Sequence, residues 1–273
     1  MTIDYGKLEK TANDIRVNII KQTYNAGSGH PGGSLSAADI LTMLYFHEMN
    51  IDPENCKKPD RDKFVLSKGH AAPVLYATLA EKGFFPKEDL ITLRKLGSPL
   101  QGHPDKNKVP GVEMSTGSLG QGFSASVGMA IASKLDGGGR VYALLGDGEL
   151  QEGIVWEAAM SAAHYKLDNL VAIVDWNGLQ IDGKNEEVMS VTPIDEKFES
   201  FGFHVIKIDG HCLNQIGKAF AEARTVKGKP TVIIAKTSKG KGVSFMEDVA
   251  GWHGKAPNEE QAKECIRELG GEW

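Results

Sequence analysis

The chain has 273 residues, of which 41% are hydrophobic and 25% charged, and it carries a formal net charge of −5. These values are ordinary for a soluble globular protein, and the length suffices for one large α/β domain or two small ones. The two signs of charge are interspersed, so no basic block indicates nucleic-acid binding and no acidic tail indicates a charged partner. No apolar run approaches the length of a membrane-spanning helix.

The three cysteines, Cys56, Cys212 and Cys265, are isolated in the sequence. Their spacing fits neither a zinc site nor a disulfide framework, which favours a reducing compartment. The N-terminal residues lack the apolar core of a signal peptide. We therefore expect a cytoplasmic protein that does not act at a membrane.

Segments with the apolar periods of helices and strands alternate along the chain. The pattern predicts helices over residues 7–24, 36–49, 87–96, 124–135, 152–165, 194–201, 213–225 and 259–269, and a further helix that follows Pro73 and ends at Lys82. It predicts buried strands over residues 64–67, 141–145, 170–174, 204–208 and 231–235. Such strands indicate an α/β fold in which a parallel sheet has helices on both faces. Since the chain has no internal repeat or clear linker, we expect one domain spanning residues 1–273.

Local signals refine three of these segments. Ser36 is a possible N-cap of the second helix, with Asp39 as its capping partner. Pro86 stands in the favoured first-turn position of the helix predicted over residues 87–96. Residues 180–193, which are rich in Asp, Gly, Asn and Glu, are expected to form a loop.

The chain is organised around the strand–helix–strand unit of residues 141–179. The first strand ends at Gly146-Asp147-Gly148 and the second at Asp175-Trp176-Asn177. Asp147 and Asn177 thus lie at the sheet edge where open α/β folds bind ligands. A carboxylate and an amide oxygen suit Mg²⁺ or Ca²⁺, and the neighbouring glycines allow a phosphate to approach the backbone. The alternative is an ordinary strand-to-helix turn capped by Asp147.

Three histidines lie in loops or at strand-to-helix junctions. His30 lies among small residues in segment 26–34, His70 follows the first predicted strand, and His103 lies in the irregular segment 97–113. A lone loop histidine is more often exposed to solvent than catalytic, and His103 taken alone fits that interpretation. The glycines beside His30 and His70 favour a functional role because they let the backbone approach a ligand.

Two other segments have the composition of anion sites. The Gly-rich segment 115–122 leads directly into a helix, whose unpaired N–H groups and dipole favour a phosphate, although its spacing is not that of a dinucleotide fold. Segment 236–242 places three lysines and two glycines after a strand, as a solvated basic turn also would. One edge of a parallel sheet would bring five features together, namely His30, His70, residues 117–122, Asp147 with Asn177, and Lys239 with His253.

The ordered set of motifs resembles the amino-terminal, diphosphate-binding domain of transketolase. The segments that carry the resemblance are Ser28-Gly-His-Pro31, Leu66-Ser-Lys-Gly-His-Ala-Ala-Pro73, Gly102-His-Pro104, Thr116-Gly-Ser-Leu-Gly-Gln-Gly122, Leu145-Gly-Asp-Gly-Glu-Leu-Gln-Glu-Gly153, Tyr165-Lys-Leu-Asp-Asn-Leu170 and Trp252-His-Gly254. Other thiamine enzymes share little beyond Gly-Asp-Gly and the later Asn, so the complete set is specific. The resemblance covers nearly the whole chain.

The resemblance implies the thiamine diphosphate-binding fold and a set of residue roles. Asp147, Asn177 and the backbone carbonyl of Leu179 would bind the Mg²⁺ (or Ca²⁺ or Mn²⁺) that bridges the diphosphate. The residues that would contact the cofactor or lie beside it are His70, Gly117, Leu119, Gly148, Glu152, Asn177, Lys239 and His253. Within that set, Gly117 and Leu119 would pack near the cofactor rings, and Glu152 resembles a carboxylate of the family's subunit-interface network.

The resemblance also implies an activity. His30, His103 and His253 would line the reaction centre, hydrogen-bond substrate oxygens and move protons, which suits histidine because its pKa lies near neutrality. The reaction would transfer a two-carbon unit from a ketose phosphate to an aldose phosphate by covalent catalysis on thiamine diphosphate. We expect a transferase of the pentose phosphate pathway.

The resemblance further implies a partner. Family transketolases continue into a pyrimidine-binding domain and a third domain, whereas this chain ends at Trp273. The glutamate that protonates the aminopyrimidine and most arginines that grip the substrate phosphate lie in those domains. We therefore expect the amino-terminal subunit of a split transketolase, in an α2β2 complex with a carboxy-terminal subunit. Alone, the chain is expected to hold metal and diphosphate weakly at best.

Three alternatives stay open at this point. One is a two-subunit transketolase specialised for another ketose phosphate of a catabolic pathway. Another is 1-deoxyxylulose-phosphate synthase, which Ser28-Gly-His-Pro31 and Ser67-Lys-Gly-His70 disfavour. The third is a non-catalytic assembly or regulatory paralogue. A paralogue that has lost catalysis would be expected to have lost site residues as well. The motif residues are all present, however, namely His30, His70, His103, Asp147, Asn177 and His253.

Overall fold

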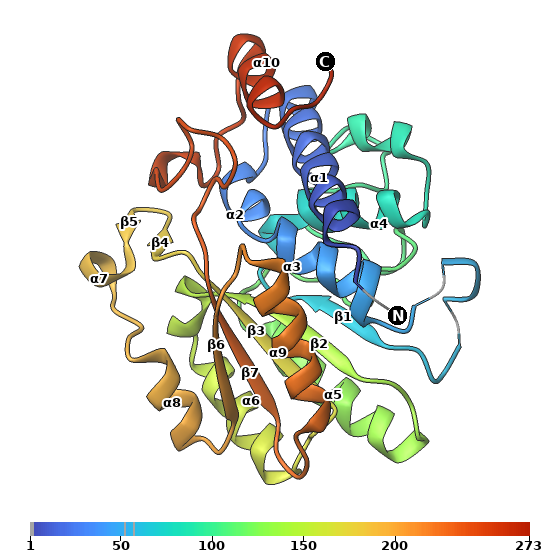
Figure 1. The fold of residues 1–273 in the computed structure, drawn as a ribbon, viewed down its shortest axis with the longest axis vertical. Coiled ribbons are helices and arrows are strands. Elements are labelled where there is room, and N and C mark those ends of the chain that lie inside the picture. Colours follow the sequence, from blue (N-terminus) through green and yellow to red (C-terminus); the bar gives the residue numbers. More distant parts are fainter. Residues whose placement is uncertain (1–2, 52, 57) are drawn as a thin grey trace.

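A computed structural model describes residues 3–51, 53–56 and 58–273, and a five-stranded sheet lies at its centre (Figure 1). The strands are β1 (Lys63–Leu66), β2 (Val141–Gly146), β3 (Leu170–Trp176), β6 (His204–Asp209) and β7 (Thr231–Lys236). Their order across the sheet is β1-β2-β3-β7-β6, and every neighbouring pair is parallel. All five strands predicted from the sequence are confirmed.

Successive residues of the strands face opposite sides of the sheet and enter two separate cores. In β2, Tyr142 and Leu144 pack into one core, whereas Val141, Ala143 and Leu145 pack into the other. Nearly all of these side chains are fully buried, which explains why the strands are continuous apolar runs. A sheet with a core on each face needs a helical layer on each side.

The helices form those two layers (Figure 1). One core is covered by α1 (Tyr5–Ala26), α3 (Ala38–Met43), α4 (Ala72–Lys82) and α9 (Leu213–Thr225). The other is covered by α5 (Gln121–Asp136), α6 (Gly153–His164) and α8 (Ile194–Ser200). The remaining α-helices of the described residues are α2 (Pro31–Leu35), α7 (Asn185–Val188) and α10 (Glu259–Glu268). The predicted fold class, a parallel sheet with helices on both faces, is confirmed.

The long N-terminal helix and the C-terminal helix have well-defined ends. Asp4 caps α1 by accepting a hydrogen bond from the Lys7 N–H, and Gly27 ends the helix at a φ of 58°. Asn258 and Gln261 form a reciprocal capping box at the start of α10. Because α10 packs against α1, the last helix is joined to the first.

The start of the second predicted helix differs from expectation. A short helix, α2, occupies residues 31–35, and Ser36 and Asp39 do not form a capping box because each has a buried tertiary partner. The Ser36 hydroxyl donates to Asp175 at 2.6 Å, and Asp39 pairs with Arg16 at 2.5 Å. Beyond α3, the chain forms a π-helical turn over Leu44–Glu48.

Two other segments also differ from expectation. The predicted helix 87–96 is a 3₁₀ helix that ends at Thr92, because the chain turns back at Arg94, with a φ of 60°, so that the Arg94 N–H binds the Leu100 carbonyl. The predicted loop 180–193 contains the strand β5 (Gly183–Lys184), which pairs with β4 (Leu179–Gln180), and then α7. Among the described residues, no helix is both long and apolar enough to cross a membrane.

Candidate active site

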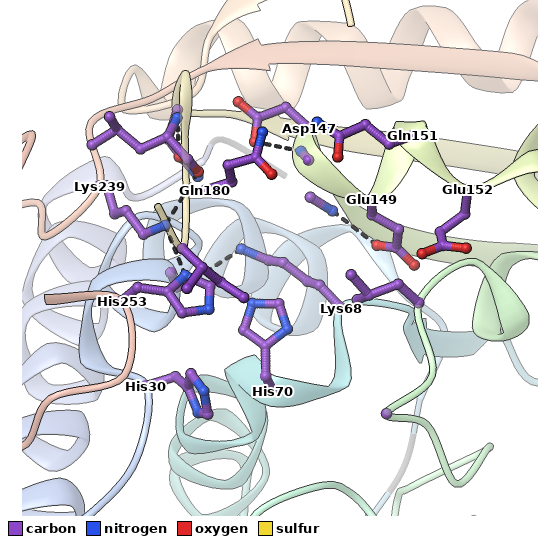
Figure 2. Close-up of a pocket in the computed structure, with 18 residues that line it drawn as sticks. His30, Lys68, His70, Asp147, Glu149, Gln151, Glu152, Gln180, Lys239 and His253 are labelled. Atoms are coloured by element: carbon purple, nitrogen blue, oxygen red, sulfur yellow. Dashed lines mark hydrogen bonds between the residues drawn. The ribbon is translucent and has the colours of Figure 1, made fainter. Parts of the chain in front are cut away.

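A pocket of about 290 Å³ lies where the parallel strands end. The predicted site residues that line it are His30, His70, Gly117, Leu119, Asp147, Gly148, Glu152, Asn177, Leu179, Lys239 and His253. They come from the segments that follow β1, β2, β3 and β7 and from two Gly-rich loops. Figure 2 shows His30, His70 and His253 grouped on one side and Asp147, Glu149 and Glu152 on the other. The fold therefore brings together residues that are as much as 223 positions apart (His253 against His30).

Asp147 lies at the turn after β2, with 2% of its surface exposed. Its two carboxylate oxygens accept hydrogen bonds from the Gly148 N–H at 2.9 Å and the Gly178 N–H at 2.5 Å. Burial raises the pKa of Asp147 to about 6, and the nearby Asp175 carboxylate also raises it, against the two backbone donors. A buried carboxylate of this kind would be stabilised by a bound cation.

Three oxygens in the pocket are suited to a hard divalent cation. They are the Asp147 carboxylate, the Asn177 side-chain oxygen, which accepts from the Leu179 N–H at 3.1 Å, and the Leu179 carbonyl. The Leu179 carbonyl already faces a positive charge, since the Lys239 ammonium donates to it at 3.2 Å. The described residues contain no group of three or more His, Cys, Asp or Glu side chains placed to hold a metal ion. This donor set fits Mg²⁺ or Ca²⁺ with added phosphate oxygens and does not resemble a zinc site.

His30, His70 and His253 form a compact cluster. The distances between their ring centroids are 5.2 Å (His30 to His70), 5.3 Å (His30 to His253) and 5.1 Å (His70 to His253). Burial lowers the pKa of His30 to about 4 and that of His253 to about 3, and it lowers the pKa of His70 as well; nearby cationic side chains add to each shift. All three rings are therefore neutral near pH 7, and each has one donor and one acceptor nitrogen.

Lys239 connects this cluster to the oxygen site. Its ammonium lies 3.0 Å from Nδ1 of His253. An ammonium can only donate, so His253 Nδ1 accepts and the ring proton lies on Nε2. Burial lowers the pKa of Lys239 to about 8, although the Asp147 charge opposes the shift. The cluster thus combines neutral imidazoles with a buried cation, an environment that favours an anionic ligand.

The sequence did not reveal a buried ion pair between Asp175 and Lys68, a residue that lines the pocket. Lys68 donates to the carboxylate of Asp175 and, at 2.8 Å, to the Gly33 carbonyl. Ser36 and Thr237 also donate hydroxyl hydrogen bonds to Asp175. Burial opposes ionisation of Asp175, but Lys68 and the hydroxyl groups together lower its pKa. A buried pair with all these partners fixes residues 33–36 and the segments that follow β1 and β7 relative to β3.

Glu149 is a second buried carboxylate that the sequence did not single out. It accepts from the Ser67 hydroxyl at 2.5 Å, the Gly120 N–H at 2.7 Å and the Gly146 N–H at 3.0 Å. Burial raises its pKa, while these donors oppose the increase. Glu149 therefore clamps the ends of β1 and β2 to the loop that carries Gly117 and Leu119. Its neighbours in sequence, Gly148 and Glu152, were predicted, but only the fold reveals its partners.

His103 is the one predicted catalytic residue that does not line the pocket. Its ring packs behind Gly117, where an added Cβ would lie 3.1 Å from His103 Cδ2. Burial and the charge of Arg94 lower the pKa of His103. The charge of a protonated His103 would in turn lower the pKa of His30, so the two rings are close enough to interact.

Comparison with known proteins decides the family. Residues 8–272 match the family described as transketolase, thiamine diphosphate binding domain. The chain belongs to the transketolase family. It is 46% identical over 263 residues to a 6-deoxy-6-sulfo-D-fructose transketolase subunit from Clostridium sp. (strain MSTE9), covering 96% of each chain. It is 45% identical over 263 residues to an apulose-4-phosphate transketolase subunit from Phocaeicola vulgatus, covering 96% of this chain and 93% of that one.

Solved structures of transketolases have the same fold. The transketolase from Leishmania mexicana superposes with a TM-score of 0.92 at 34% identity, over 97% of this chain and 41% of the Leishmania chain. The predicted resemblance to the amino-terminal domain of transketolase is thus confirmed. This chain is the thiamine diphosphate-binding part of a transketolase-type transferase, and it spans less than half the length of this single-chain family member.

Proposed function

We propose that this chain is the amino-terminal subunit of a transketolase that transfers a two-carbon ketol unit from a ketose phosphate to an aldose phosphate. The observation that carries the proposal is the pocket in which the histidine cluster, Lys239 and the Asp147 oxygen site meet. We further propose that residues 1–273 form one domain. The match over residues 8–272 and the packing of α10 on α1 support this proposal.

Within this proposal, Asp147, Asn177 and the Leu179 carbonyl hold Mg²⁺, with Ca²⁺ or Mn²⁺ as substitutes. His70, Lys239, His253 and the backbone at Gly148 lie beside the diphosphate, and Gly117 and Leu119 pack near the cofactor rings. The buried Lys239 ammonium and the lowered pKa values of the histidines support these assignments, since an anion would stabilise positive charge that burial disfavours.

Thiamine diphosphate supplies the electron sink for carbon–carbon bond cleavage when it is bound. This chain's contribution is to position the reactants, move protons and exclude water. His30 Nδ1 is buried and has no hydrogen-bond partner among the described residues, so it is free to bind a sugar hydroxyl. His253 presents its Nε2–H, because its Nδ1 accepts from Lys239. His103 would act from the edge of the site, beyond Gly117.

The partner in this proposal is a carboxy-terminal subunit that carries the pyrimidine-binding domain, in an α2β2 complex. Two relatives that are named as subunits match nearly end to end, which supports a two-chain enzyme. Ile181 lines the pocket and is 68% exposed, and Val188 and Met189 in the same segment are 41% and 62% exposed. Such an apolar surface beside a site indicates a docking region. Glu152, at the pocket rim, would contribute to that interface.

We also propose a cytoplasmic enzyme of the pentose phosphate pathway. The three described cysteines, Cys56, Cys212 and Cys265, are free thiols, as expected in a reducing compartment. A second candidate is a transketolase specialised for an unusual sugar, since the relatives of similar length act, by name, on 6-deoxy-6-sulfo-D-fructose and apulose 4-phosphate. Rates with xylulose 5-phosphate, apulose 4-phosphate and 6-deoxy-6-sulfo-D-fructose as alternative donors would discriminate between the two.

The test is purification of tagged chain from its native cell extract, with co-purifying proteins identified by mass. We expect an equal amount of a pyrimidine-domain protein and a ketol-transfer activity that needs thiamine diphosphate. Substitution Asp147→Ala should abolish that activity, whereas Asp195→Ala, which alters a carboxylate on α8, should not. Full activity in the Asp147→Ala complex would rule out the metal assignment, and recovery of folded chain without any partner would contradict the two-chain enzyme.

A further inference from the structure

The turn of residues 237–240, which follows β7, places Lys239 at the pocket and is held by several hydrogen bonds. The Thr237 N–H donates to the Trp176 carbonyl at 3.1 Å, and the Lys239 carbonyl accepts from the Asp248 N–H at 2.8 Å. Three further hydrogen bonds join the turn to other segments. The Thr237 hydroxyl donates to Asp175, the Ser238 N–H donates to His211 Nε2 at 2.9 Å, and the Gly240 N–H donates to the Gly32 carbonyl at 3.0 Å. The first of these three partners, Asp175, belongs to β3, and the third, Gly32, belongs to α2. The second, His211, comes from the β6–α9 connection and does not line the pocket.

The hydrogen bonds of His211 determine its tautomer. Because the Ser238 backbone N–H can only donate, His211 Nε2 must be unprotonated and accept. The ring proton therefore lies on Nδ1, which is 2.8 Å from Oδ2 of Asp39. Asp39 also accepts from Arg16 at 2.5 Å. Carboxylate–histidine pairs of this type hold an imidazole in one tautomer and one orientation.

This chain of contacts is largely shielded from water. Arg16 and Asp39 are 5% and 7% exposed, and the His211 side chain is 15% exposed. Burial opposes ionisation of Asp39, yet its hydrogen bond to His211 and the charge of Arg16 lower its pKa. The contacts therefore run from α1 through α3 and the β6–α9 connection to the backbone of Ser238, with the Asp39 carboxylate charged.

The residue after Ser238 is Lys239, which is 2% exposed and whose ammonium reaches both the Leu179 carbonyl and His253. We propose that His211 is a positioning residue for Lys239. Through its Nε2 acceptor, His211 sets the turn that aims the ammonium at the diphosphate, and Asp39 sets the tautomer of His211. The role of Lys239 at the diphosphate belongs to the proposed function, on which this inference rests.

Two substitutions of His211 test the hydrogen bonds of its two ring nitrogens separately. His211→Gln retains an acceptor near the position of Nε2 and can still receive the Ser238 N–H. His211→Asn retains a donor near Nδ1, which preserves the contact with Asp39, but it loses the acceptor for Ser238. We expect His211→Gln to bind Mg²⁺ and thiamine diphosphate within about threefold of wild type and His211→Asn to bind at least about tenfold more weakly, as for a lost buried hydrogen bond.

The experiment is calorimetric titration of the full chain, in complex with its complementary subunit, with thiamine diphosphate and Mg²⁺. Hydrogen exchange of residues 237–240 without ligand is a second measurement that does not depend on activity; it should rise in His211→Asn and not in His211→Gln. His204→Asn, which changes a histidine paired with Glu222 on the surface of β6, is the matched control. In the Lys239→Met background, His211→Asn should cause little additional loss, because the group that it positions is gone.

The outcomes are distinguishable. Equal binding by both His211 variants, or the same loss from His211→Asn with and without Lys239, would overturn the positioning role while leaving the proposed function intact. No binding of thiamine diphosphate by the wild-type complex would overturn the proposed function and, with it, this inference.

Discussion

Asp147 and Lys239 both line the pocket, and burial opposes the charge of both. The pKa of Asp147 is raised to about 6 and that of Lys239 is lowered to about 8. An Asp with a raised pKa binds its proton more tightly in the folded chain than in the unfolded one. The ligand-free chain therefore loses stability as the pH rises from about 4 to about 6, and the loss is complete above that window.

From this sign we expect Asp147→Asn to stabilise the ligand-free chain at pH 7.5, by on the order of 3 kcal/mol, because the substitution removes a buried carboxylate. The gain should disappear below about pH 4, where the wild-type residue is protonated. Urea denaturation at the two pH values, with Asp136→Asn as the exposed control, provides the measurement. A stability difference that does not depend on pH would contradict the assignment of the effect to Asp147 ionisation.

The histidine cluster leads to a second expectation for single residues. The imidazoles of His30 and His253 should stay neutral as the ligand-free chain is titrated from pH 8 to pH 5, because their pKa values are about 4 and about 3. Lys239→Met should raise the pKa of His253, since the Lys239 charge adds to the effect of burial, whereas Lys218→Met on the exposed face of α9 should not. Proton NMR of the ring hydrogens reports both. A wild-type midpoint near 6.5 for either ring would show that the cluster is solvated.

At the scale of residues, most of the predicted site residues do line the pocket, but the buried residues that hold them in place were not predicted. Asp147, Asn177 and Lys239 were predictable because each follows an apolar strand, and strand ends share one edge in a parallel sheet. Lys68 and Asp175 were not, since a buried ion pair 107 positions apart leaves no local pattern. For the same reason, nothing in the sequence around His211 indicates that it binds the backbone of Ser238. His103 was predicted from its motif, but its position behind Gly117 depends on how the 97–113 loop folds.

At the scale of elements, Glu149 determines how the Gly-rich loop joins the sheet. Glu149→Ala would leave the Gly120 and Gly146 N–H groups without their acceptor in a buried region, and we expect destabilisation of about 2–4 kcal/mol. Glu149→Gln retains an acceptor oxygen and should cost less. Chemical denaturation checks both, with the exposed Glu199→Ala as control. Equal stability of Glu149→Ala and Glu199→Ala would show that Glu149 does not hold the Gly-rich loop to the sheet.

Helices and strands were predicted correctly where the local apolar pattern determines them, and wrongly where a backbone reversal or a tertiary contact does. The strands were predicted because burial on both faces requires continuous apolar residues, and β2 and β3 satisfy this along their length. The prediction of a helix over 87–96 was wrong because the backbone reverses at Arg94. Arg94 has a left-handed φ, but no glycine at this position marks the turn in the sequence. The capping box at Ser36 failed because the hydroxyl binds Asp175, a tertiary contact that overrides a local one.

At the scale of the whole molecule, the apolar surface beside the pocket gives a prediction about assembly. Ile181→Asp should weaken binding of the complementary chain by at least about tenfold, because it places a charge in the proposed interface. The unfolding midpoint of the isolated chain should not change, since Ile181 is 68% exposed. Leu135→Asp, at the far end of α5 and 81% exposed, is the matched control. Sedimentation of equimolar mixtures would measure the effect, and equal complex formation by the two variants would place the interface elsewhere.

The central claim is that this pocket is the diphosphate half of a thiamine diphosphate site that a second chain completes. The most direct measurement is a titration of thiamine diphosphate with Mg²⁺ against the chain alone, the reconstituted complex and the Asp147→Ala complex. We expect weak binding by the chain alone, binding at least about a hundredfold tighter by the complex, and loss of that gain in the Asp147→Ala complex. Equally tight binding by the chain alone, or binding by the complex that does not depend on Asp147, would contradict the claim.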